Sequence, residues 1–209
     1  MITIADRTLS RIVSQTKPHM GDRNDSEAVQ VITFEFADGH LYTWATNRYT
    51  LAVARTQAKG DDKPWLAVMG RQQMPELAAA IRLLDAKPIS MERNGDHLIL
   101  SGESGSRITI ELQDDRQLLD WRKVVAAAAE RPSAAKPMAL DPKFFAAWKS
   151  LPGPVQMWSS GEQKAGVIIA ADFIGLQMPI NPSPEAANSL RRELDSWKPA
   201  EPASLAAAA

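Results

Sequence analysis

Three times along this sequence, a short strand pattern leads into an amphipathic helix pattern and then into antiparallel strands. The units begin with the strand patterns Ile2–Ile4, Trp65–Val68 and Met138–Leu140, and Asp6 is the expected N-cap of the first helix. Each helix pattern spaces apolar residues three or four positions apart, and the strands after it alternate apolar and polar residues. This internal repeat of roughly 65 to 70 residues predicts an α+β protein made of strand-helix-strand-strand-strand units.

The strands of the first unit carry the strongest local signals, in residues 34–55. Asp38 and Gly39 are typical of a two-residue hairpin turn between two alternating segments. A third alternating segment follows a polar corner at residues 46–50. The pattern predicts three antiparallel strands with an exposed corner.

Composition excludes several classes of protein. The chain has no Cys, and its three His residues show no metal-ligand spacing. No phosphate-binding loop, dinucleotide fingerprint or nucleophile elbow occurs. The N-terminus lacks the pattern of a secretory signal, and no apolar run has the length of a membrane span. The sequence therefore predicts a cytoplasmic protein that is not an enzyme, that has no cofactor or metal, and that does not enter a membrane.

Three separated segments resemble one protein family. The corner reads Ala-Thr-Asn-Arg-Tyr-Thr-Leu-Ala at residues 45–52, and it resembles the "ATDGHRLA" or "ATDRYRLA" corner of the bacterial-type β sliding clamp. That protein is the processivity subunit of DNA polymerase III. Residues 118–125 are similar to the "FPDYRRVLP" crossover between its middle and last domains, and residues 173–180 to its closing "YLLMPVR" strand.

The resemblance implies a DNA-clamp fold, in which two units form a domain with antiparallel sheets on one face and helices on the other. Residues 1–115 would form one complete clamp-like domain and 116–136 the crossover and an Ala/Pro-rich linker. A half-domain of one unit would occupy 137–181, and 182–209 would be a largely mobile tail with a short helix around Leu190 to Trp197. The shortened form suggests a phage or mobile-element origin.

The resemblance also implies a groove that binds short, extended apolar peptides of DNA polymerases and repair proteins. The matching positions are Val29, Thr46, Arg48, Tyr49, Thr50, Leu51, Leu119, Lys123, Val124, Leu176, Met178, Pro179 and Ile180. Apolar and Met side chains make an adaptable floor, and Arg48, Lys123 and Tyr49 can hold a peptide's backbone or acidic groups. Alternatively, Leu51, Leu176 and Ile180 are plain sheet core. Three positions depart from the family: Asn181 replaces a basic residue, Leu119 replaces Pro, and Arg48 replaces the Gly of one family version.

The helix spans suggest a second surface. Residues 6–17, 70–87 and 141–150 hold eight basic and four acidic residues, although the whole chain has a net charge of −1. The basic residues are Arg7, Arg11, Lys17, Arg71, Arg82, Lys87, Lys143 and Lys149. In a clamp such helices face double-stranded DNA without reading its sequence. The alternative is the ordinary charged outer face of an amphipathic helix.

These implications give a function. The chain would be a sliding-clamp-like processivity factor that tethers replication or repair proteins to DNA, with a clamp loader and further copies of itself as partners. Rings of this family close with twelve strand-helix-strand units, so three units per chain would need four chains. The alternative is a non-encircling clamp relative that acts as a peptide-binding regulator or decoy of clamp clients.

Overall fold

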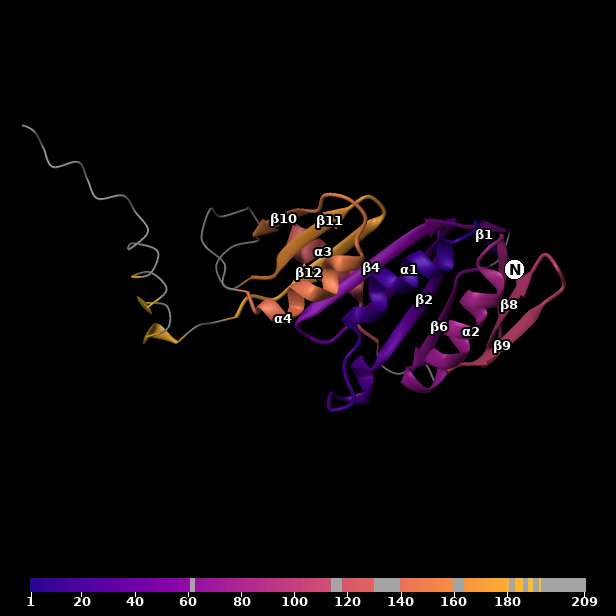
Figure 1. Cartoon of the computed structure of the whole chain (residues 1–209), viewed down its shortest axis with the longest axis horizontal. Coiled ribbons are helices and arrows are strands. Elements are labelled where there is room, and N and C mark those ends of the chain that lie inside the picture. Colours follow the sequence, from indigo (N-terminus) through magenta and orange to yellow (C-terminus); the bar gives the residue numbers. More distant parts are fainter. Residues whose placement is uncertain are drawn as a thin grey trace, which may run out of the picture.

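The computed structural model describes residues 1–60, 63–113, 118–129, 140–159, 164–180, 183–185, 188–189 and 192. It contains two antiparallel sheets with helices packed on them, so the expected α+β class is confirmed (Figure 1). In the described part of the chain, no helix is long and apolar enough to cross a membrane.

The larger sheet has seven strands in the order β10-β11-β12-β4-β3-β2-β6. Its strands are β2 (Val31–Ala37), β3 (His40–Thr46), β4 (Thr50–Gln57), β6 (Trp65–Gly70), β10 (Gln156–Ser159), β11 (Gly166–Ala170) and β12 (Phe173–Gln177). The three strands expected in residues 34–55 are β2, β3 and β4. Asp38 and Gly39 form the turn between β2 and β3 with φ of 51° and 71°, as a type I′ turn requires.

The smaller sheet has five strands in the order β5-β1-β7-β8-β9. They are β1 (Ile2–Ile4), β5 (Lys59–Gly60), β7 (Ile89–Asn94), β8 (His97–Gly102) and β9 (Arg107–Glu111). The first two units exchange their leading strands: β1 pairs with β7 of the second unit, and β6 pairs with β2 of the first. Each sheet therefore needs both units, which makes them one interlocked body.

Most helices cover one face of these sheets. The main ones are α1 (Thr8–Thr16), α2 (Met74–Leu84) and α4 (Pro142–Phe145), with the 3₁₀ turns η1 (Lys17–His19), η2 (Glu27–Val29), η3 (Arg71–Gln73) and η4 (Ala146–Ser150). Leu9, Leu77 and Trp148 from these helices share one buried core with strand residues such as Phe34 and Ile89. Helices α1, α2 and α4 lie on the viewer's side of the strands in Figure 1.

The first helix is capped from the second unit, so the expectation that Asp6 is its N-cap is wrong. The N-cap position is Arg7, whose side chain makes no capping bond. Instead, the buried Asp85 carboxylate accepts hydrogen bonds from the backbone amides of Leu9 and Ser10, each 3.0 Å long. The Arg7 amide donates to the backbone carbonyl of Asp85 at 2.6 Å. Two of the free N–H groups that begin every helix are thereby satisfied by a residue about one unit away in sequence.

The helix α3 (Trp121–Ala129) lies on the opposite face of the seven-stranded sheet. Trp121 Nε1 donates to Glu35 Oε2 at 3.1 Å, and Arg122 forms an ion pair with the same carboxylate at 2.7 Å. The crossover and linker were expected at residues 116–136, and Trp121–Ala129 of this stretch form α3, where the Ala residues have a high helix propensity. Not every helix is therefore on one side, and the crossover is fastened to β2 through Glu35.

The third unit extends the sheet of the first, because β12 pairs with β4 along its whole length. Trp148 fixes this join: its Nε1 donates to Gln177 Oε1 at 2.7 Å, and its ring lies against Gly175. Of the leading strand expected at Met138–Leu140, Met138 and Ala139 lie outside the described residues, and Leu140 is described but is not in a strand. The expected domain boundary at residue 115 also lies outside the described residues. The same holds for the expected tail helix around Leu190 to Trp197, of which only Arg192 is described.

Candidate functional site

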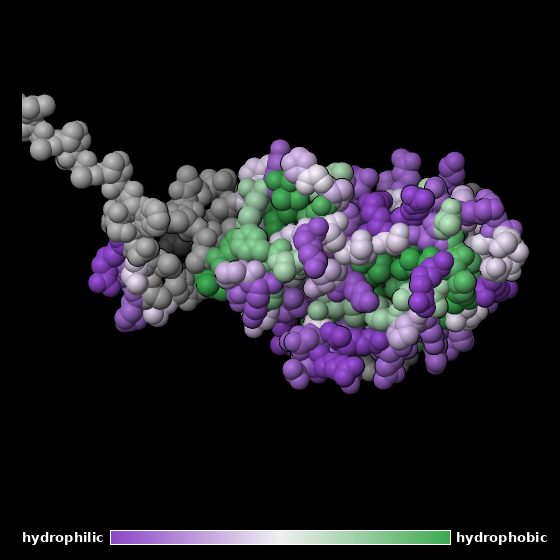
Figure 2. All heavy atoms as spheres, viewed as in Figure 1, coloured by the Kyte–Doolittle hydropathy of each residue, from purple (hydrophilic) through white to green (hydrophobic). Residues whose placement is uncertain are grey.

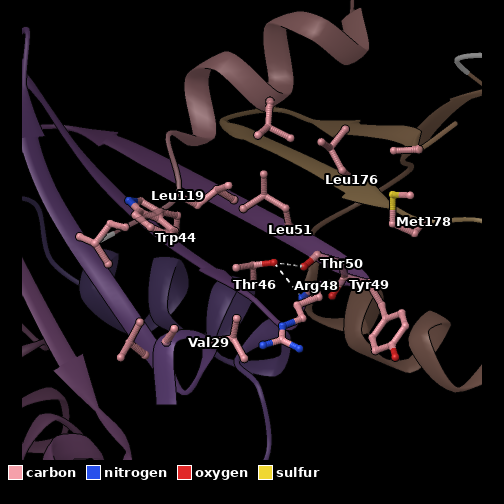
Figure 3. A pocket seen from close by; sticks show the side chains of 15 residues that line it. Val29, Trp44, Thr46, Arg48, Tyr49, Thr50, Leu51, Leu119, Leu176 and Met178 are labelled. Atoms are coloured by element: carbon pink, nitrogen blue, oxygen red, sulfur yellow. Dashed lines mark hydrogen bonds between the residues drawn. The ribbon is translucent and has the colours of Figure 1, made fainter. Parts of the chain in front are cut away.

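An apolar cavity of about 490 Å³ opens on the sheet face that carries α3 (Figure 3). Its walls come from four places: the loop before β2 and the first residue of that strand, β3 and β4 with the corner between them, the residues before and on the first turn of α3, and the residues just before β11 and at the end of β12. The lining residues are Ala28, Val29, Val31, Trp44, Thr46, Arg48, Tyr49, Thr50, Leu51, Leu118, Leu119, Val124, Ala165, Leu176 and Met178. We call this cavity the groove.

Ten of the thirteen residues expected at a peptide site line the groove. The other three are Lys123, Pro179 and Ile180, which lie beside it on α3 and after β12. Sequence reasoning missed Ala28, Val31, Trp44, Leu118 and Ala165. Trp44 was within reach of that reasoning, because it lies two residues before Thr46 and alternate residues of a strand point to the same face.

Three buried side chains form the floor of the groove. Leu51 and Leu176 are opposite each other across β4 and β12, and Trp44 lies on the neighbouring strand β3. All three also belong to the apolar core beneath α3. Leu51 and Leu176 are thus both sheet core and groove lining, whereas Ile180 is 45% exposed and is not core.

The corner above this floor is held by its own side chains. Asn47 Oδ1 accepts hydrogen bonds from the Tyr49 amide at 3.1 Å and the Thr50 amide at 2.8 Å. Thr46 Oγ1 accepts from the Arg48 amide at 3.1 Å and donates to the Thr50 carbonyl at 2.8 Å. Arg48 has φ of 73°, in the left-handed region that favours glycine. This conformation gives a physical reason why Gly suits the same position in one version of the corner.

The mouth of the groove presents an aromatic ring and a basic side chain. Tyr49 is 54% exposed, its ring stacks on Phe144 at 5.2 Å, and its carbonyl accepts from the Met178 amide at 2.7 Å. The Lys143 ammonium lies 5.8 Å from the centre of the Tyr49 ring. Arg48 points toward the loop that carries Val29 and donates to Ser26 Oγ at 2.7 Å (Figure 3).

A buried histidine supports the corner from behind. His19 Nδ1 is 2.9 Å from Thr50 Oγ1, which donates to Asn47 Oδ1 at 3.0 Å. Burial lowers the pKa of His19 to about 4, and a backbone hydrogen bond with Ala147 offsets only part of that shift. The imidazole is therefore neutral at neutral pH and acts as a structural hydrogen-bonding group.

The eight basic residues expected to face DNA belong to the helices on the other side of the sheet or to turns next to them. Seven of them are exposed, and Arg11 is half-buried. Arg11 Nη2 donates to the Arg55 carbonyl at 3.3 Å and Arg71 Nη2 to the Gly21 carbonyl at 2.6 Å, so these two also brace the fold. Lys143 lies at the groove mouth. Figure 2 shows hydrophilic and hydrophobic side chains interspersed on this side, with an apolar area over the third unit.

No metal site accompanies either surface within the described ranges, where no three His, Asp or Glu side chains cluster closely enough to hold an ion. The two surfaces differ in chemistry: one face has an apolar hollow with a polar mouth, and the other has exposed cations.

Comparison with known proteins gives the fold a name. No family model matches the sequence, and no curated protein is similar to it. Solved structures do match. A DNA polymerase sliding clamp from Pseudomonas aeruginosa superimposes with a TM-score of 0.68 at 13% identity, over 86% of this chain and 66% of the clamp. A putative DNA polymerase III beta subunit from Eubacterium rectale gives 0.70 at 12% identity, over 87% and 66%.

A third match is a sliding clamp from Pseudomonas aeruginosa bound to griselimycin, with a TM-score of 0.68 at 14% identity, over 87% and 66% of the two chains. The chain thus spans about two thirds of the length of these clamps. Identities this low show the fold alone, and that fold agrees with the resemblance of the corner, crossover and closing strand. This chain has the DNA polymerase III beta sliding-clamp fold.

Proposed function

We propose that the chain is a clamp-like tether, whose groove binds a short, extended apolar peptide from a DNA polymerase or repair protein. The observation that carries the proposal is the groove, where the corner, the crossover and β12 meet around one apolar hollow. Its volume of about 490 Å³ is within the usual range of roughly 300–1,000 Å³ for ligand sites. The protein needs no catalytic group for this task and would act in the cytoplasm.

The chemistry of the groove suits such a peptide. Apolar peptide side chains would bury against Leu51, Leu176 and Trp44, the main source of binding free energy. Tyr49 and Met178 are exposed at the mouth and would close over them. Arg48 offers a guanidinium for an acidic side chain or a backbone carbonyl.

We further propose that the helices on the opposite face hold the phosphate backbone of double-stranded DNA. Exposed Lys17, Arg82 and Lys149 support this, and the matched structures are clamps of DNA polymerases. Such contacts are independent of base sequence and weaken with salt. A ring of twelve units cannot be closed by one chain with three, so encircling DNA would require several copies and a protein that loads them.

The alternative is a non-encircling regulator or decoy, and the edge of the larger sheet bears on it. Within the described residues, β10 has β11 as its one neighbour, and Met157 and Trp158 on β10 are 39% and 43% exposed. If no second chain pairs with this edge, the protein can still bind client peptides in the groove without closing a ring. In that form it would compete with a complete clamp for the same partners.

Two measurements test the proposal. A labelled Gln-Leu-Ser-Leu-Phe peptide should bind the chain, and griselimycin should compete with it. In the presence of a clamp loader and ATP, the protein should also be retained on nicked circular DNA and lost from linear DNA, with retention that falls as salt rises. Peptide binding without DNA retention would select the regulator, and absence of both would refute the proposal.

A further inference from the structure

The chain leaves the sheet at the mouth of the groove. Met178 lines the groove, and its amide donates to the Tyr49 carbonyl at 2.7 Å. Ile180 follows two residues later and is 45% exposed. The residues that come after it therefore start within a few residues of a hollow that is open and apolar.

The sequence after Ile180 holds one segment that needs an apolar partner. Leu190, Leu194 and Trp197 are the large apolar residues between positions 181 and 204, and they recur at i, i+4 and i+7. That spacing puts all three on one side of a helical segment. Pro199 and Pro202 follow. A single short amphipathic segment is marginal in water unless its apolar side is covered.

We propose that residues 190–197 dock in the groove of their own chain and thereby compete with peptides from other proteins. The inference rests on the proposed function of the groove as a peptide site. It gives that site a regulator: a partner must displace the chain's own segment before it is tethered.

The connection is long enough. Sixteen positions separate Met178 from Leu194. A linker of that length has a root-mean-square span of about 20 Å or more, which allows the chain to turn back over the groove. A tethered segment experiences an effective concentration in the millimolar range, so even weak docking would fill the groove most of the time.

One acid of this segment fits the charge around the groove. Glu193 and Asp195 flank Leu194, and together with Arg191 and Arg192 they leave residues 190–197 without net charge. Around the groove stand the cations Arg48 in the lining, Lys143 over the Tyr49 ring, and Lys123 on the first turn of α3. With Leu194 on the apolar floor, Glu193 at the border of the apolar side would lie near a basic side chain, whose attraction is stronger next to a desolvated surface. Asp195 would point away from the groove.

The exposed residues on β10 are a poorer partner for this segment. Met157 and Trp158 lie two strands away from β12, about 10 Å across the sheet. They also stand on an open sheet edge, whereas the groove is a recess that would enclose Leu194 and Trp197 on several sides.

Disulfide trapping tests the docking directly, because the chain has no Cys of its own. Ser196→Cys is combined with Ala28→Cys in the groove, with Ala78→Cys on the exposed side of α2, or with Val155→Cys next to β10. We expect the groove pair to form a disulfide within one chain at least about tenfold faster than either other pair. Adding Leu194→Ala and Trp197→Ala should remove that difference. Equal rates for all three pairs, or a faster reaction with Val155→Cys, would overturn the proposal.

A second readout separates this inference from the proposed function. The labelled Gln-Leu-Ser-Leu-Phe peptide should bind the Leu194→Ala/Trp197→Ala chain about tenfold more tightly than the full wild-type chain. If it binds both equally and the groove pair does not cross-link, the docking is wrong and the peptide site stands. If it binds neither while the groove pair cross-links, the docking stands and the proposed function is wrong.

Discussion

The imidazole of His19 packs on the indole of Trp148, with ring centroids 4.2 Å apart. His19 ends the helical segment of the first unit, and Trp148 belongs to the third unit. His19 also contacts Thr50 of the groove corner, while Trp148 donates to Gln177 at the end of β12. This buried pair therefore joins two units directly behind the groove.

The first prediction is a loss of stability in mild acid that depends on His19. Burial lowers the pKa of His19 from 6.5 to about 4. Between these values the unfolded chain binds a proton that the folded chain excludes, so stability is complete above pH 6.5 and falls as the pH drops toward 4. The full effect is on the order of 3 kcal/mol in the free energy of unfolding. Urea unfolding across this pH range measures it.

His19→Gln is the control for that measurement, because an amide keeps hydrogen-bonding groups but does not titrate in this range. The variant should be less stable than wild type at neutral pH and show a shallower decline toward pH 4. An equally steep decline in the variant would assign the acid sensitivity to carboxylates instead.

The second prediction concerns the close contact of Gly175 and Trp148. A Cβ at position 175 would lie 2.5 Å from the nearest ring atom of Trp148. Gly175→Ala should therefore displace the indole and lower the free energy of unfolding by about 1–3 kcal/mol, as overpacking of a core usually does. Chemical denaturation measures the loss.

The double variant with Trp148→Phe tests the cause of that loss. The smaller ring leaves room for the new methyl group, so the two changes together should cost less than the sum of their separate effects. Strict additivity would show that the methyl group and the indole do not collide.

The resemblance to the sliding-clamp family, carried by three short segments, was enough to find ten of the fifteen residues that line the groove. The corner, the crossover and β12 each have a recognisable pattern. The alternation of side chains along a strand then shows on which face of the sheet Leu51 and Leu176 lie. The three strands of residues 34–55 were also predictable, because Asp38 and Gly39 are suited to the positive φ values of their turn.

Other features depend on contacts between residues far apart in sequence, which no local pattern contains. The exchange of β1 and β6 between units is one case, since each leading strand could equally pair within its own unit. The capping of α1 by Asp85 is another, because its partners Leu9 and Ser10 lie 76 and 75 positions away. Likewise, the position of α3 follows from its contacts with Glu35 on β2.

The third prediction tests the groove. Met178→Ala should weaken the labelled peptide by about tenfold or more, since loss of an apolar anchor usually costs about 1–3 kcal/mol. Leu51→Ala should do the same, although it also removes core. Leu83→Ala is the matched control, because Leu83 is 72% exposed on α2 and lies away from the groove. Fluorescence anisotropy gives the affinities. Equal peptide binding by the wild type and by a folded Met178→Ala/Leu51→Ala double variant would show that the groove is not the peptide site.

The fourth prediction tests the helix face. The triple change Lys17→Glu, Arg82→Glu and Lys149→Glu should abolish retention on DNA and leave peptide binding intact, because the groove is on the other side of the sheet. Arg11 is left unchanged, because its side chain donates a hydrogen bond to the Arg55 carbonyl within the fold. The control is the triple change Lys59→Glu, Arg107→Glu and Lys164→Glu, at three exposed cations outside the helices. It changes the net charge by the same amount and should have a much smaller effect on DNA retention. Comparable losses of DNA retention in both triple variants would show that retention depends on net charge and not on the helix face.

The fifth prediction concerns association of the chain. Phe145 is 49% exposed, and Met157 and Trp158 are exposed on β10, the last strand of its sheet among the described residues. An uncovered edge with apolar residues on both faces favours pairing with another chain. We therefore expect light scattering at micromolar concentration to give a mass above that of one chain, which is 22.9 kDa.

Charged substitutions at this edge identify the contact. Met157→Lys and Trp158→Glu should return the mass to one chain, since inward-pointing charges block edge pairing, and neither residue lines the groove. A mass of four chains that these changes abolish would support a closed ring of twelve units. One-chain mass for the wild type at every concentration would exclude the ring, and peptide binding by that monomer would then favour the regulator over the tether.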